Sequence, residues 1–155
     1  MAYIAPNNTK TLRRICLEET TQPIIPYKKN TVLNFIHNNP DTSNFYNIIK
    51  LAHAEYIFND MNITVFLPDN THCVYQNMNK VSALEIIYKC IIPEKIPMVL
   101  LTSSYALKIP TLYDKYYVET KYDNYNGLLL NNNTRILKSD IQCNNGVIHQ
   151  VTNIL

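Results

Sequence analysis

The stretch Asp140-Ile-Gln-Cys-Asn-Asn-Gly-Val-Ile-His-Gln-Val151 decides the fold of this chain. Two strand-like runs flank Asn144-Asn145-Gly146, and Asn and Gly are the residues that best tolerate the backbone angles of tight turns. We therefore expect a hairpin whose turn would strain most other residues. Side chains alternate along a strand. The second run is therefore predicted to place Ile148 and Gln150 on one face and three residues on the other, namely Val147, His149 and Val151.

His149 is the chemically distinctive residue of this stretch, since it shares a face with two valines. We expect a partly buried histidine that is satisfied by a hydrogen bond, because buried polar groups are normally paired. A ligand-binding or catalytic role is the alternative. Cys143 lies across the turn, where contact with His149 is feasible but not implied by the sequence.

A second informative stretch is Ile63-Thr-Val-Phe-Leu-Pro-Asp-Asn70. Its first five residues are β-branched or apolar without polar alternation, which predicts a central strand buried on both faces. Pro68 is expected to end this strand, and Asp69 or Asn70 can cap the turn that follows.

Helical periodicity dominates the chain before and after this strand. Residues 31–37 suit a short helix, and residues 11–19 could form another. Asp41-Thr-Ser43 offers N-caps to a following amphipathic run. One buried face is predicted there from apolar residues at three- and four-residue steps, namely Phe45, Ile48, Ile49, Ala52 and Tyr56. Residues 80–92 repeat the pattern with Val81, Leu84, Ile87, Tyr88 and Ile91.

The last third of the chain favours strands over residues 116–120, 128–130, 134–138 and 146–151. Asn-rich turns separate them, and Asn126-Gly127 is a strong turn dipeptide because both residues tolerate positive φ. Helices that precede a mostly antiparallel sheet indicate an α+β fold in a single domain.

The two quoted stretches resemble the signature boxes of fasciclin-type domains, Thr-Val-Phe-x-Pro-x-Asn and Asp-Ile-x-x-x-Asn-Gly-Val-Ile-His. The matching residues are Thr64, Phe66, Pro68, Asn70, Asp140, Asn145, Gly146 and His149. The resemblance covers roughly residues 30–155. It implies N-terminal helices packed on a mostly antiparallel β-sheet wedge over residues 31–155, preceded by an extension of residues 1–30. Family members commonly continue the first box with small and aromatic residues, whereas this chain has Thr71-His72-Cys73.

The resemblance also implies a function. Fasciclin-type domains are adhesion modules, so we expect a non-enzymatic domain that binds a protein or a glycan on a surface. Metazoan members carry a Tyr-His pair that is linked to integrin binding. The matching position here is Tyr88-Lys89, which weakens any transfer of that binding. Tyrosines are strong interface residues, and the binding candidates are Tyr88, Lys89, Tyr116 and Tyr125, with Tyr113, Tyr117 and Tyr122 as further exposed tyrosines. The alternative is that alternate tyrosines simply line the sheet.

Composition limits the alternatives. The net charge is +2, as the sum of +3 on residues 1–30 and −1 on the rest of the chain. No basic-aromatic pattern for nucleic acid is visible. The abundance of Asn, Ile, Tyr and Lys is typical of an AT-rich genome, such as that of a large DNA virus or a protist. An alternative function is therefore a virion- or matrix-associated structural protein that uses the fold for packing.

The sequence shows neither a secretory leader nor a run of roughly 20 apolar residues that could cross a bilayer. We expect cytosolic synthesis with packaging into virions, or the cell-surface location that the family implies. Three N-x-S/T sequons, at Asn7, Asn62 and Asn132, matter only in a secretory pathway.

The chain offers no convincing catalytic or metal-binding constellation. Its cysteines are far apart, without a CxxC pair, and are expected to be small buried hydrophobes; they are Cys16, Cys73, Cys90 and Cys143. His72-Cys73 and the pair Cys143/His149 are the only hints of a thiol nucleophile or a zinc site. We therefore expect no metal, no cofactor and no enzymatic activity.

Overall fold

The computed structural model describes residues 30–155 apart from Met61 and Tyr105. The predicted extension, except Asn30, and the short helix expected over residues 11–19 lie outside the described residues. The helices of the described part are α3 Val32–Asn38, α4 Ser43–Leu51, α5 Lys80–Cys90 and α6 Met98–Leu101, with 3₁₀ helices at Pro40–Thr42 and Glu55–Asn59. The strands are β1 Ile63–Pro68, β2 Ile91–Ile92, β3 Ala106–Pro110, β4 Tyr117–Asp123, β5 Gly127–Leu130, β6 Ile136–Cys143 and β7 Gly146–Val151.

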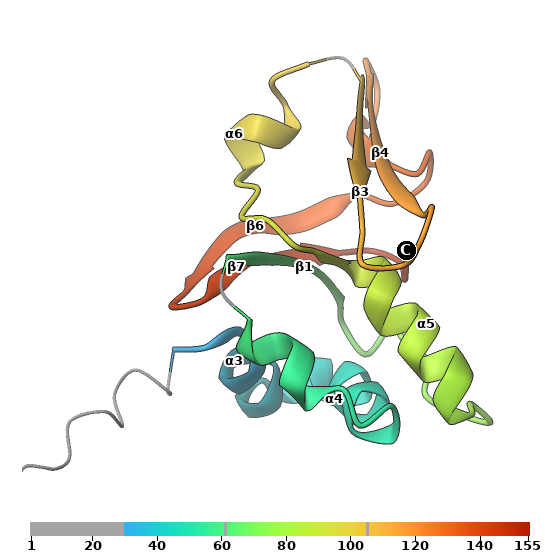
Figure 1. Ribbon diagram of the computed structural model, residues 1–155. Helices are drawn as coiled ribbons and strands as arrows, with labels where there is room; N and C mark the ends of the chain where they lie inside the picture. Colours follow the sequence, from blue (N-terminus) through green and yellow to red (C-terminus); the bar gives the residue numbers. More distant parts are fainter. Residues whose placement is uncertain (1–29, 61, 105) are drawn as a thin grey trace, which may run out of the picture. The chain divides into compact units, whose positions relative to one another are not determined.

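A four-stranded mixed sheet of order β2-β1-β7-β6 unites the two stretches that decided the fold (Figure 1). β1 and β7 pair in parallel, from Ile63 opposite Gly146 to Pro68 opposite Val151. All six residues of β1 are buried, so the prediction of a central strand is confirmed. β6 and β7 form the expected antiparallel hairpin around Asn144-Asn145.

The two faces of this sheet carry separate hydrophobic clusters. Ile63, Val65 and Leu67 of β1 pack with α3, α4, α5 and Ile148 on one face. Phe66, from the opposite face of β1, packs with Leu101 and Val118 and with the end of β7. In Figure 1, α3 and α4 accordingly lie on one side of the sheet and α6 and β3–β4 on the other. The alternation predicted for β7 is confirmed, since Ile148 joins the first cluster and Val151 the second.

A second sheet, of order β3-β4-β5, is antiparallel throughout. One face of β4 is buried through Val118 and Thr120, while Tyr117, Glu119 and Lys121 are exposed on the other. The sheet therefore presents a polar outer face to solvent. β3 was not foreseen, because its sequence Ala-Leu-Lys-Ile-Pro is short and lies between proline- and serine-containing segments.

The predicted helix over residues 31–37 is present as α3, and the next predicted helix is present as α4 with Phe45, Ile48 and Ile49 buried. The prediction for Tyr56 is wrong. α4 ends at Leu51, and Tyr56 follows in a 3₁₀ helix with 62% of its surface exposed. The chain turns at His53, whose φ of 51° is incompatible with a continuing α-helix.

The predicted face of α5 is only partly right. Ile87 is buried and Leu84 packs against the core, but Val81 is 77% exposed. The helix ends at Cys90, so the buried Ile91 belongs to β2 and not to the helix face. Ala83 and Cys90 are the other buried residues of α5, and their smaller side chains gave a weaker periodic signal than Val81 and Ile91 did.

Both glycines occupy turns or turn edges, but only Gly127 has the positive φ that was predicted. Gly146 does not have a positive φ; it is the first residue of β7, and a Cβ there would collide with the carbonyl oxygen of Ile63. Close approach of two parallel strands is therefore what requires glycine. At the other turn, Gly127 has a φ of 72°, whereas Asn126 does not have a positive φ, and residues 124–126 form a three-residue loop.

Candidate functional site

Lys89, in the last turn of α5, is the centre of a polar and aromatic cluster at the surface. Its Nζ lies 2.7 Å from Oε2 of Glu85, one helical turn earlier, in an ion pair. It also lies 4.7 Å from the ring centre of Tyr116 and 5.1 Å from that of Tyr113, within cation–π range. The hydrogen bond that Lys89 donates to the Glu85 carboxylate is the main cause that raises the pKa of Lys89, so the ammonium stays charged at neutral pH.

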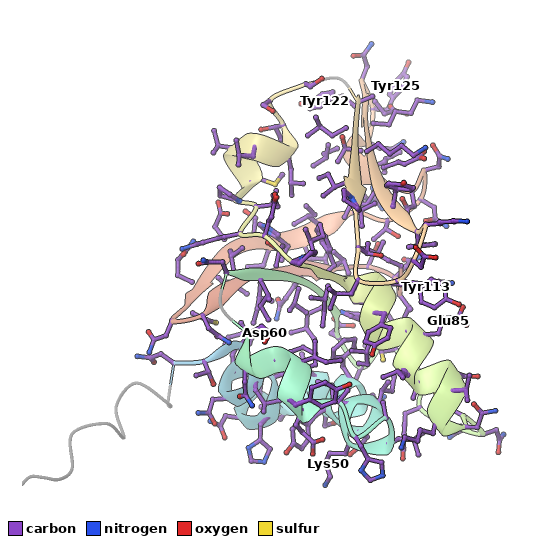
Figure 2. All side chains as sticks on the ribbon, viewed as in Figure 1. Lys50, Asp60, Glu85, Tyr113, Tyr122 and Tyr125 are labelled. Carbon is purple, nitrogen blue, oxygen red and sulfur yellow. The ribbon has the colours of Figure 1, made fainter. Side chains whose placement is uncertain are left out.

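The loop that carries the two tyrosines is held by Thr111. The backbone N–H and the hydroxyl of Thr111 both donate to the carbonyl of Tyr116, at 3.0 and 2.9 Å. The same hydroxyl accepts from the N–H of Tyr113 at 3.2 Å. The tyrosine rings meet edge to face, 6.5 Å apart. The loop thus presents its aromatic side chains in a fixed arrangement, and Figure 2 shows Tyr113 and Glu85 close together beside α5.

Asn131 joins this cluster to the β3-β4-β5 sheet. Its Nδ2 donates to the hydroxyl of Tyr116 at 3.2 Å. Its Oδ1 accepts from the N–H of Glu119 and its own N–H donates to the carbonyl of Glu119, both at 2.8 Å. Asn131 and Asn132 both have positive φ, of 50° and 70°, which Asn tolerates better than most residues.

Beside Tyr116 the surface forms a shallow hollow of about 430 Å³. Its lining combines cationic, aromatic, carboxylate and amide side chains; the residues are Lys108, Lys115, Tyr116, Tyr117, Glu119, Asn131 and Asn132. Nζ of Lys108 lies 4.6 Å from the ring centre of Tyr117. We call this surface, together with Lys89 and Tyr113, the tyrosine–lysine face.

The structure brings together only two of the four binding candidates, Lys89 and Tyr116. Tyr88 is half-buried, and a hydrogen bond with Tyr56 raises its pKa, so its hydroxyl is engaged away from Lys89. Tyr125 is 97% exposed at the β4–β5 turn. It lies at the opposite end of β4 from Tyr116, roughly 20 Å along the strand, and Figure 2 shows Tyr113 and Tyr125 far apart.

Sequence reasoning named Tyr113 and Tyr117 among the exposed tyrosines, but it missed the carboxylate, the amides and the further lysines of the face. Lys108 and Asn131 come from segments that carry no motif, and only strand pairing places them beside Tyr116 and Tyr117. Glu85, the ion-pair partner of Lys89 beside the face, did have a local signal, because a Glu four residues before a Lys on a helix is a favourable pair.

The residues of the first signature box hold the fold together. The Thr64 hydroxyl donates to the carbonyl of Glu94 at 2.6 Å and accepts from the N–H of Ile96 at 2.7 Å, which ties the loop after β2 to the sheet. Phe66 is fully buried, and Pro68 is the last residue of β1.

Asn70 acts on a helix that is distant in sequence. No side chain of α4's own N-terminal segment caps it, contrary to the prediction from Asp41-Thr-Ser43. Instead, Oδ1 of Asn70 accepts from the N–H of Asn44 at 2.8 Å, and its Nδ2 donates to the carbonyl of Pro40 at 3.0 Å.

In the second box, Asn145 joins three segments. Its Oδ1 accepts from the N–H of Val32 at 2.9 Å, and its Nδ2 donates to the carbonyls of Phe58 and Asp60 at 2.6 and 3.0 Å. Its side chain therefore uses donors and acceptor alike, and α3 is fixed against the start of β7.

His149 is fully buried with both ring nitrogens engaged. Nε2 lies 2.8 Å from the carbonyl of Ile96, and Nδ1 accepts from the N–H of Asp140 at 3.2 Å. Because a carbonyl only accepts and an amide only donates, these partners select the neutral tautomer with hydrogen on Nε2. Burial lowers the pKa of His149, which also favours the neutral ring. Asp140, whose φ is 58°, accepts from the N–H of Met98 at 2.9 Å.

The cysteines that the structure describes do not offer a reactive thiolate. Cys73, Cys90 and Cys143 are all free thiols, the first two buried. Burial raises the pKa of these thiols to about 11 for Cys73, about 12 for Cys90 and about 11 for Cys143. They are therefore protonated at neutral pH and are poor nucleophiles. Cys16 lies outside the described residues.

Within residues 30–155, Met61 and Tyr105 excepted, no group of three or more His, Cys, Asp or Glu side chains could hold a metal ion. In the same part of the chain, no helix has the length and apolar character to cross a bilayer.

Comparisons with known proteins agree with this architecture. A family model described as the fasciclin domain matches residues 40–155. Among solved structures, the chain is similar to a FAS1 domain pair from the insect cell adhesion molecule Fasciclin I, with a TM-score of 0.66 and 18% sequence identity. The similarity covers 81% of this chain, which spans only half of that chain's length. No curated protein matches the chain in a sequence search.

Proposed function

Because the chain belongs to the fasciclin domain family, we propose that it is a non-enzymatic adhesion or interaction module that binds a protein or a glycan on a surface. The family is known for such modules. The proposed module comprises residues 31–155. α3 lies outside the family match but belongs to the same core, because Val32 and Ile36 are buried there and Asn145 binds the backbone of Val32.

The tyrosine–lysine face is the observation that carries this proposal. Recognition surfaces favour aromatic side chains with little freedom left to lose, since ordering flexible groups opposes binding. Here Tyr116 is fixed by Lys89 on its ring and by Asn131 on its hydroxyl. The signature residues Thr64, Asn145 and His149 are committed to internal hydrogen bonds, so they support the module without contacting a partner.

An adhesion assay tests the proposed function. The full chain is attached to beads, and the fraction of beads retained on cell layers and on extracellular-matrix extracts is measured under flow. We expect retention above that of beads carrying the heat-denatured chain. The variant Tyr116→Ala is expected to reduce retention, and Tyr125→Ala is the matched control at a tyrosine outside the face. Retention equal to that of the denatured chain on every surface, at high bead density, would contradict the proposal.

A further inference from the structure

The charges at the hollow are unbalanced. The lining holds two cations, Lys108 and Lys115, and one carboxylate, that of Glu119. Glu119 lies opposite Lys108 in the β3–β4 register. Opposite charges at paired strand positions offset each other. In the part of the chain that the structure describes, neither lysine forms an ion pair. Lys115 is thus a cation at the edge of the hollow without a matching carboxylate in the lining.

Lys115 also has an unusual backbone. Its φ is 60°, in the left-handed region where Gly or Asn would be more stable. A lysine there costs on the order of 1 kcal/mol relative to glycine. Such a residue is consistent with a role for its side chain, since left-handed non-glycine residues cluster at functional sites.

The remaining lining residues supply hydrogen bonds and flat surfaces. Asn131 and Asn132 bring amide groups, and Tyr116 and Tyr117 bring aromatic rings together with hydroxyls. Among the described residues, the lining contains no aliphatic side chain and is open to solvent, so it lacks the apolar pocket that anchors most peptides. A sugar ring fits these groups better. Its C–H groups pack on an aromatic face, and its hydroxyls form hydrogen bonds with amides.

We propose that this hollow binds an anionic oligosaccharide, a sugar chain that bears carboxylate or sulfate groups. The proposal rests on the proposed function and names the ligand class of the same face. Lys115 and Lys108 contact the anionic groups, the tyrosine rings contact the sugar rings, and the two asparagines bind hydroxyls. Asn132 is also the acceptor of a sequon, so a glycan attached there would fill the hollow itself.

Isothermal titration calorimetry on the full chain tests the proposal. The protein is produced in a bacterial host without N-glycosylation, which keeps the hollow open at Asn132. Four probes are compared: a hyaluronan hexasaccharide with carboxylates, a heparin hexasaccharide with sulfates, neutral cellohexaose, and hexaglutamate as an acidic peptide. The test variant is Lys108→Gln/Lys115→Asn. Asn suits the left-handed backbone at position 115, so this variant is expected to fold.

The control variant Lys50→Gln/Lys80→Gln removes the same charge from exposed lysines of α4 and the start of α5. Figure 2 shows Lys50 apart from Tyr113 of the tyrosine–lysine face. We expect at least one acidic sugar to bind, the test variant to lose about fivefold or more in affinity, and the control to keep its affinity. Higher salt is expected to weaken binding.

The proposal is overturned by equal binding of cellohexaose, by tighter binding of hexaglutamate than of both acidic sugars, or by unchanged affinity in the test variant. Absence of heat with all probes, at millimolar concentration, overturns it as well. The bead assay separates this failure from failure of the proposed function. If the beads are still retained on cells but the chain binds no acidic sugar, the proposed adhesion function stands and only the proposed ligand class is refuted.

Discussion

At the scale of single residues, Gly146 shows how one position fixes the pairing of two strands. It lies opposite Ile63 in the parallel register, with no room for a Cβ beside the Ile63 carbonyl. Backbone cannot move aside as a flexible side chain can. We therefore expect Gly146→Ala to lower the free energy of unfolding by about 3 kcal/mol, the upper range for overpacked sites.

Urea denaturation followed by circular dichroism measures this loss. The matched control is Gly127→Ala, because a Cβ on Gly127 meets nothing within 4 Å. Its positive φ alone predicts a cost of about 1 kcal/mol. Equal losses in the two variants would show that close approach of the strands is not what requires glycine at position 146.

His149 gives the fold a dependence on pH. Burial lowers its pKa below the ordinary 6.5, so the unfolded chain binds a proton that the folded chain rejects. The contribution of neutral His149 to the free energy of unfolding is therefore fully present above pH 6.5. It is expected to fall as pH drops from 6.5 towards the lower pKa of the folded state. Thermal unfolding between pH 7 and pH 5 measures this loss.

His149→Gln is expected to flatten this profile, whereas the control His53→Asn, at an exposed histidine, should preserve it. Hydrogen bonds lower the pKa of Asp69, mainly from Thr71, and of Asp123, mainly from the N–H of Tyr125. Their contributions are lost only as pH falls below 3.8, so they do not overlap the histidine window. A profile that is unchanged by the loss of His149 would refute this assignment.

At the scale of secondary-structure elements, α4 depends on a residue that is 26 positions away. Asn70 caps the N–H of Asn44, while α5 is capped locally by Asn79, whose Oδ1 accepts from Ser82 at 2.8 Å. A cap is worth about 1 kcal/mol. Asn70→Ala is expected to cost about 2 kcal/mol, because its amide also binds the carbonyl of Pro40.

Asn79→Ala is the comparison, with an expected loss of about 1 kcal/mol. Urea denaturation of both variants gives the two free energies of unfolding. Hydrogen exchange of the α4 amides should increase in Asn70→Ala and stay unchanged in Asn79→Ala. A loss for Asn70→Ala no larger than that for Asn79→Ala would contradict the dual role of Asn70.

Much of this element scale was accessible from the sequence, because strong local patterns coincide with local structure. The buried run of β1 and the hairpin of β6 and β7 are confirmed by the structure. The end of α4 at Leu51 was missed because apolar spacing continued to Tyr56, while the turn at His53 has no glycine or proline to signal it. The parallel pairing of β1 with β7 is a long-range contact that no local pattern encodes.

The candidate site was less predictable than the fold. Tyr116 and Lys89 were chosen separately, and their contact depends on the Thr111 loop lying against α5. The place of Lys115 at the hollow depends on backbone angles that sequence periodicity does not report. Binding surfaces assemble from segments far apart in the chain, whereas helices and strands leave a periodic signal in one segment.

At the scale of the whole module, the signature residues and the proposed binding surface have separate tasks. Thr64 and His149 hold the segment around Ile96 to the sheet, and Asn145 holds α3. The proposed contact surface lies elsewhere, on residues outside both boxes. Under this proposal, the side chains that meet the partner are not those that maintain the fold.

The most direct test of the central claim is a hydrogen-exchange comparison of the full chain free in solution and bound to the surface that retains it in the bead assay. The account predicts slower exchange on binding at residues 111–119 and 129–134, which carry the tyrosine–lysine face, and no change in α3 or α4. Slower exchange confined to α3 and α4, or to the tip at Tyr125, would contradict the assignment of the binding face.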